Sequence, residues 1–155
     1  MYTRTGSDDL ERKVLNDVED RGWHCLHITE EGGQPPFSFS IGFYKTWKFP
    51  ELIAVGLSSE VTQAAFNLIA ETLTAGRKID LRSTNEDLFE GYACAFIEVE
   101  KPHFREYVGT AIWYYESTNF PLYQIIWPSK DGLYPWNPSA STHFKAWQPV
   151  LGHVS

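Results

Sequence analysis

Apolar and polar residues alternate in the stretch PPFSFSIGF at residues 35–43, as is typical of a strand. From residue 37 onward the odd positions carry Phe, Phe, Ile and Phe, whereas the even positions carry only Ser38, Ser40 and Gly42. Successive side chains of a strand point to opposite faces of a sheet. The pattern therefore predicts one heavy face that packs into a core and one face of small groups.

The same reasoning along the chain predicts the other elements. Helical spacing of apolar residues predicts helices from Ser7 to Gly22, over 59–75 and over 102–115. Further strands are predicted at 23–29, 51–57, 91–101, 120–128 and 133–136. Because strands occur in clusters, the predicted fold class is α+β. We expect a single domain with a mixed or largely antiparallel sheet of about five to six strands packed against two to three helices.

Residues 59–75 carry the clearest helical pattern. Ser58 or Ser59 caps the helix, and Gly76 ends it. The stripe predicted to face the core consists of Val61, Ala65, Leu68, Ile69 and Leu73. In contrast, 80–88 is predicted to be a loop and 137–155 an irregular C-terminal tail.

Length and charge narrow the class of protein. The 155 residues suit one domain, which buries roughly 68–70% of its unfolded surface without needing disulfides. Thirteen basic against 20 acidic residues give a formal net charge of −7. That charge repels a phosphate backbone, so no nucleic-acid partner is expected. An acidic surface instead suits a small ligand or a basic protein partner.

The sequence indicates a cytoplasmic protein without a membrane partner. The longest aliphatic stretch, 52–57, is far shorter than the ~20 residues that cross a bilayer. The N-terminal residues contain no apolar stretch like the core of a signal peptide. Cys25 and Cys94 form no metal or redox motif and are predicted to be reduced thiols.

No catalytic constellation, metal site or cofactor site is predicted. His24 and His27 lie three residues apart on a strand, so they point to opposite faces and cannot share a metal ion. Cys25 and His27 share a face, but their Cβ atoms would be about 7 Å apart, which is long for a nucleophile and its base. A buried structural thiol is the favoured interpretation.

Three residues have two interpretations each. Glu51 stands at the head of a strand predicted to be buried on both faces, where it either caps or pairs with a neighbour or has a functional role. Trp113 and Tyr114 lie off the predicted core side of the third helix. Such residues are common both at binding surfaces and in partly exposed packing around a sheet.

Two blocks carry a family resemblance. The first contains S-I-G and F-P-E-L within residues 40–52, and the second contains Q-I-I-W-P and D-G-L-Y-P-W within 124–136. With GWHCLHI and GYACAF, they make the chain resemble the bacterial domain-of-unknown-function family 4262 (DUF4262) from about Gly22 to Trp136. The resemblance implies a small bacterial cytoplasmic protein in which the two blocks lie close together, and it implies no catalytic residue.

If the blocks are neighbours, a shallow aromatic groove is expected, with small polar groups on its floor. Ser38, Ser40 and Gly42 form its floor, Trp127 and Trp136 stand in its walls, and Asp131 lies in the turn between the walls. The predicted binding residues are these six together with Glu51, Trp113 and Tyr114. Alternatively, the helix at 59–75 or the C-terminal tail covers the Ser/Gly face, because small residues permit close packing.

Two functions fit these observations. The first is a protein-interaction module, of which an immunity protein neutralising a basic antibacterial toxin is a specific form. The second is a small-molecule or cofactor-binding domain, or an enzyme, that uses the aromatic groove. The oligomeric state has no signal in the sequence.

Overall fold

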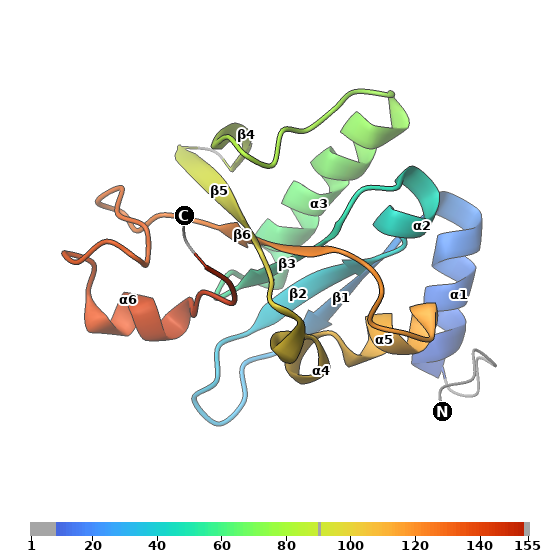
Figure 1. Ribbon diagram of the computed structural model, residues 1–155, viewed down its shortest axis with the longest axis horizontal. Helices are drawn as coiled ribbons and strands as arrows, with labels where there is room; N and C mark the ends of the chain where they lie inside the picture. The colour runs from blue at the N-terminus through green and yellow to red at the C-terminus, as the bar shows by residue number, and fades with distance from the viewer. Residues whose placement is uncertain (1–8, 90, 154–155) are drawn as a thin grey trace.

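Six strands form one mixed sheet in the order β1-β2-β3-β6-β5-β4 (Figure 1). The computed structural model describes residues 9–89 and 91–153. The strands are β1 His24–Ile28, β2 Phe37–Ile41, β3 Glu51–Val55, β4 Asn85–Phe89, β5 Tyr92–Glu98 and β6 Leu122–Ile126. Neighbouring strands pair antiparallel, except that β3 and β6 are parallel in the centre of the sheet.

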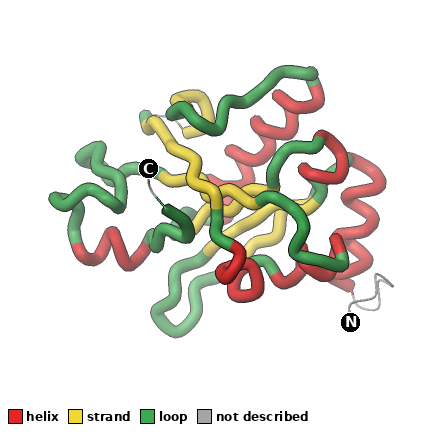
Figure 2. The backbone as a smooth tube through the Cα atoms, in the orientation of Figure 1, coloured by secondary structure: helices red, strands yellow, loops and turns green. Residues whose placement is uncertain are grey.

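Helices and loops surround the sheet (Figure 2). The helices are α1 Asp9–Arg21, α2 Phe43–Trp47, α3 Ser59–Thr74, α4 Phe104–Tyr107, α5 Gly109–Tyr115 and α6 Thr142–Trp147, and a 3₁₀ turn spans Lys101–His103. In the part of the chain that the structure describes, no helix has the length and apolar character needed to cross a membrane. The α+β prediction is confirmed.

The two faces of the sheet pack into two cores. One core joins Phe39 and Ile41 of β2 to Val14 of α1 and Ile112 of α5. The other core joins side chains from the opposite face of the sheet to α3; its fully buried members include Leu52, Ala54, Phe66, Ile69 and Ile125. β3 contributes to both cores, so its continuous apolar run is buried on both faces, as predicted.

The predicted stripe of α3 is partly wrong. Ala65 and Ile69 are buried, but Val61 and Leu68 are 44% and 42% exposed. Phe66 faces the core beside Ala65 and Ile69, with Thr62 and Ala70, so the buried side is rotated away from the predicted stripe. The largest side chain of the helix therefore sets the buried side, and two apolar residues are left at the surface.

Several short elements differ from the sequence prediction. β4 begins within the predicted loop and ends one residue after it, α2 begins at the last residue of a predicted strand, and α6 lies in the predicted irregular tail. Residues 133–136 form no strand. The predicted third helix is divided at Val108, between α4 and α5. Ser7, the predicted start of the first helix, lies outside the described residues.

Candidate functional site

The carboxylate of Glu51 is completely buried at the start of β3 and is surrounded by hydrogen-bond donors. We call this cluster the carboxylate cage. Its donors are the hydroxyls of Ser40 and Tyr115 and the backbone N–H groups of Gly42, Phe43 and Tyr44. The three amides belong to the start of α2, where N–H groups have no partner within the helix. Glu51 therefore caps α2 as a side-chain hydrogen-bond acceptor.

Local backbone geometry explains why the cage forms. Gly42 has φ +112°, and a Cβ there would lie 2.5 Å from the carbonyl oxygen of Gly22. Only glycine fits this turn, which ends β2 and directs three successive amides at one point. Ser40 reaches the same point from β2, with its Oγ 2.7 Å from Glu51 Oε1, and it accepts a hydrogen bond from the Leu52 amide.

Burial dominates the electrostatics of the carboxylate cage. It raises the pKa of Glu51 above the ordinary value of 4.5, while the hydrogen bonds from Ser40, Tyr115 and the α2 amides act in the opposite direction. Burial also raises the pKa of Tyr115, and the Glu51 charge adds to that shift. Tyr115 therefore stays protonated and donates to the carboxylate.

The raised pKa of Glu51 gives a prediction for stability against pH. Above pH 4.5 the folded protein holds a proton that the unfolded chain has released, so the free energy of unfolding falls as pH rises through the window above 4.5. Urea titrations of wild type and Glu51→Gln should show the wild-type advantage shrinking from pH 4.5 upward. An advantage that grows with pH would mean that the donors outweigh burial and that the pKa is lowered.

The predicted open face of serines does not exist. Ser38 and Ser40 are 2% and 0% exposed, because α3 lies across this face of the sheet. Ser38 Oγ lies 2.6 Å from His27 Nδ1, and His27 Nε2 lies 2.9 Å from Oε1 of Gln63 on α3. The prediction of an open groove with these residues on its floor is therefore wrong. The alternative, coverage by the helix, is what the structure shows.

The other predicted binding residues are scattered. Trp113 and Tyr114 are buried in the core at 5% and 2% exposure, so packing rather than an open surface surrounds them. Asp131 is exposed in the turn after β6. Trp136 stacks on Tyr134, with ring centroids 5.0 Å apart. The structure unites Ser40, Gly42 and Glu51 in the carboxylate cage and places Trp127 at a different site.

Trp127 lines a partly enclosed cavity of about 560 Å³, which we call the apolar pocket. Leu57, Val61 and Ala64 form the wall at the start of α3. The β4–β5 hairpin contributes Leu88, Phe89 and Tyr92, and the segment after β6 contributes Trp127, Pro128 and Lys130. The pocket thus lies beyond the carboxyl ends of the parallel strands β3 and β6, where open α/β sheets commonly bind ligands.

The Trp127 wall is held rigidly in place. Its indole N–H donates to the Val55 carbonyl at 2.9 Å, and its backbone N–H and carbonyl both bond to the side-chain amide of Gln148. Phe144 of α6 packs edge-on against the indole, with ring centroids 5.1 Å apart. Gly56 has φ +90°, and a Cβ there would lie 3.0 Å from the indole. The wall is therefore preorganised.

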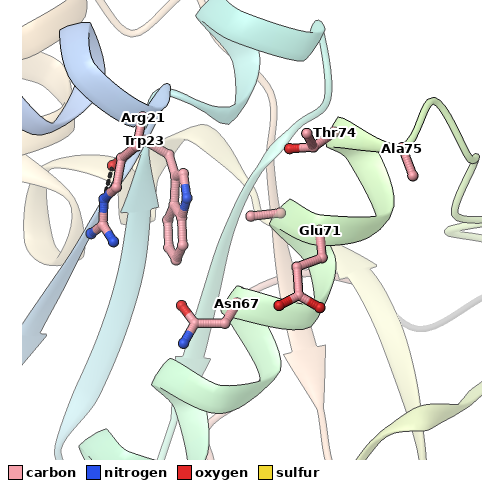
Figure 3. Close-up of a pocket in the computed structure, with 7 residues that line it drawn as sticks. Arg21, Trp23, Asn67, Glu71, Thr74 and Ala75 are labelled. Carbon is pink, nitrogen blue, oxygen red and sulfur yellow. Dashed lines mark hydrogen bonds between the residues drawn. The ribbon is translucent and has the colours of Figure 1, made fainter.

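A second hollow, of about 430 Å³, lies between Trp23 and α3 (Figure 3). Arg21 Nε donates to the Trp23 carbonyl, and its guanidinium lies 4.8 Å from the indole centroid. Asn67 and Glu71 lie on the α3 side of the indole. Because Trp23 is only 4% exposed, this hollow offers a ligand little aromatic surface.

The predicted placement of the two histidines on opposite faces of the sheet and the predicted burial of Cys25 are confirmed. His24 Nδ1 lies 2.7 Å from Asp17 of α1, whereas His27 faces α3, so the two rings lie on opposite faces of the sheet. Cys25 and Cys94 are buried free thiols. Burial raises the pKa of Cys25 to about 12 and that of Cys94 to about 11, so both thiols stay protonated at neutral pH.

The family model "Domain of unknown function (DUF4262)" matches residues 17–141 of the 155-residue chain. The chain belongs to the DUF4262 family. No curated protein and no solved structure matches it.

The two blocks that indicated DUF4262 lie side by side, because β3 and β6 are neighbours and Gln124 of the second block pairs with Ile53, the residue after the first block. In this DUF4262 domain the first block builds the carboxylate cage. The second block positions the C-terminal segment, since the Gln124 amide bonds the Pro149 carbonyl and the Leu151 N–H, each at 2.8 Å. The predicted proximity is confirmed, and both blocks have structural roles.

Sequence reasoning missed most of the apolar pocket. Its lining comes from α3 and the residues before it, from the hairpin of β5 and the unpredicted strand β4, and from the segment after β6; no motif joins these segments. One feature of the sequence did point to the pocket. α3 carries the apolar residues Val61 and Ala64 next to its buried side, so its apolar surface extends beyond the part that packs on the sheet.

Proposed function

We propose that this DUF4262 domain is a binding domain whose apolar pocket takes a small apolar or aromatic molecule. The observation that carries the proposal is the pocket's shape and position: a partly enclosed apolar cavity of about 560 Å³ beyond the carboxyl ends of two parallel strands. Ligand sites typically measure roughly 300–1,000 Å³ and are lined mainly by apolar and aromatic side chains.

The solvent exposure of the lining residues supports the proposal. Val61 and Tyr92 are 44% and 42% exposed, so apolar surface faces solvent at the mouth of the pocket. Leu88 and Phe89 are 9% and 6% exposed and form the interior wall. A ligand would remove the exposed part from water, at about 25 cal/mol per Å².

Filling the pocket tests the proposal. Ala64 is exposed on α3 and lines the pocket, so Ala64→Trp should occupy the cavity without disturbing the core. We expect the variant to bind the neutral fluorescent probe N-phenyl-1-naphthylamine about tenfold more weakly than wild type, or worse. Leu68→Trp adds the same ring to an exposed site on α3 outside the pocket and should bind like wild type. Equal binding by all three proteins would refute the proposal.

The second candidate function is capture of a basic protein, with an immunity protein against a toxin as its specific form. The observation that favours it is the formal net charge of −7. Glu30 and Glu31 are both exposed between β1 and β2, so part of that charge lies at the surface. Such a surface accelerates association with a cationic partner at low salt.

A further inference from the structure

The polar groups of the apolar pocket indicate the chemical class of its ligand. Trp127 offers no hydrogen-bond donor to a ligand, because its indole N–H and its backbone N–H both donate within the protein. The remaining lining side chains are apolar except for the Tyr92 phenol and the Lys130 ammonium. Lys130 is therefore the charged group in the lining.

The turn after β6 fixes where Lys130 leaves the backbone. The Ser129 N–H donates to the Leu133 carbonyl at 2.8 Å, and the Gly132 N–H donates to the Ser129 carbonyl at 2.9 Å. The Leu133 N–H also donates to Ser129 Oγ. These bonds fix the conformation of the turn, and the lysine side chain stays exposed.

No carboxylate among residues 9–89 and 91–153 forms an ion pair with Lys130. Asp131 follows it directly and is exposed, but it does not line the pocket. Within the described structure the ammonium therefore has no anionic partner at the mouth of an otherwise apolar cavity. A ligand that matches this arrangement has an apolar body and one anionic group.

We propose that the apolar pocket binds a small amphipathic anion, with its apolar body in the cavity and its carboxylate or sulfonate beside Lys130. This inference rests on the proposed function. A fatty acid and an aromatic acid share this chemistry. Lys130 adds selectivity for the anion, and the apolar walls supply most of the binding free energy.

Two fluorescent probes with the same ring skeleton test the role of charge. Anilinonaphthalene-sulfonate is anionic, and N-phenyl-1-naphthylamine is its neutral counterpart. Both are titrated into wild type, Lys130→Met, Lys130→Arg and the pocket-filled Ala64→Trp. Lys13→Met removes the same charge from α1, which contributes nothing to the pocket, and serves as the matched control.

We expect Lys130→Met to weaken binding of the anionic probe about three- to fivefold and to leave the neutral probe unchanged, as for one ion pair at an exposed rim. Lys130→Arg and Lys13→Met should bind both probes like wild type. Competition by a long-chain fatty acid or by an aromatic acid then identifies which source of the anion fits the cavity.

The outcomes separate the two proposals. If both probes bind, Ala64→Trp blocks them and Lys130→Met changes the two equally, the anion inference fails and the pocket proposal stands. If neither probe binds wild type, or if Ala64→Trp leaves binding intact, both proposals fail.

Discussion

Replacement of Glu51 by alanine is expected to lower the free energy of unfolding by about 3–5 kcal/mol, the largest effect among the substitutions considered. The change leaves the buried Ser40 hydroxyl and the α2 amides without their acceptor. The Tyr115 hydroxyl also loses its acceptor, and the deleted atoms leave unfilled space in the core. A loss of this size is a large fraction of the ~5–15 kcal/mol that stabilises a typical domain.

Urea unfolding at neutral pH measures the loss of stability, and two further variants serve as comparisons. Glu51→Gln keeps the shape and one acceptor oxygen, so it should fall between wild type and Glu51→Ala. Glu30→Ala removes an exposed carboxylate from a loop and should change stability by less than about 0.5 kcal/mol. If Glu51→Ala is as stable as Glu30→Ala, Glu51 does not hold α2 in place, and a role outside the fold must explain it.

Trp127→Ala is expected to reduce both stability and ligand binding. It removes a large ring packed against Phe144 and leaves the Val55 carbonyl without its donor, for a loss of about 3 kcal/mol. It also removes one wall of the apolar pocket, so binding of the neutral naphthylamine probe should weaken about tenfold. Thermal melting and probe titration of the same protein sample measure the two effects.

Trp127→Phe distinguishes the contribution of the aromatic ring from that of the indole hydrogen bond. It keeps an aromatic wall but loses the indole N–H, so it should cost about 1 kcal/mol of stability and retain most of the probe affinity. Weak probe binding by the well-folded Phe variant would show that the hydrogen bond to Val55, which fixes the ring, is needed for the wall to bind the probe. Unchanged probe binding by Trp127→Ala would remove this residue from the binding surface.

Local signals predicted α3 nearly to the residue. The Ser58 hydroxyl accepts from the Val61 amide as a cap does, and Gly76 follows the helix with φ +77°. The strands rich in β-branched and aromatic residues were equally clear. The buried side of α3 was less predictable, since Phe66 packs against both the sheet and Phe43 of α2, a helix that the pattern does not reveal.

Elements that depend on distant partners could not be predicted. α2 has five residues, too few for a helical repeat, and it is capped by a glutamate that follows it in the chain. β4 carries Asn, Glu and Asp, and it is a strand because it pairs with β5. The apolar pocket depends on β4 and on the placement of α3, so it has no motif of its own.

The candidate site residues could likewise be predicted only in part, because their surroundings depend on other elements. The sequence indicated Glu51 because it is a carboxylate in a buried strand. In the structure it accepts hydrogen bonds from five donors, all of which lie outside β3. The small residues Ser38 and Ser40 were predicted to leave open space, but they serve close packing and hydrogen bonding beneath α3. Small side chains permit both outcomes, and only the position of the covering helix decides between them.

Native mass spectrometry of the protein purified gently from its own host tests the central claim most directly, with Ala64→Trp prepared in parallel. If the apolar pocket holds a ligand, wild type should carry an extra mass on the order of a few hundred daltons, and the pocket-filled variant should lack it. An extra mass of many kilodaltons in both proteins would favour the protein-partner alternative. The same small extra mass on both proteins, or a bare wild-type chain, would contradict a resident ligand in the apolar pocket.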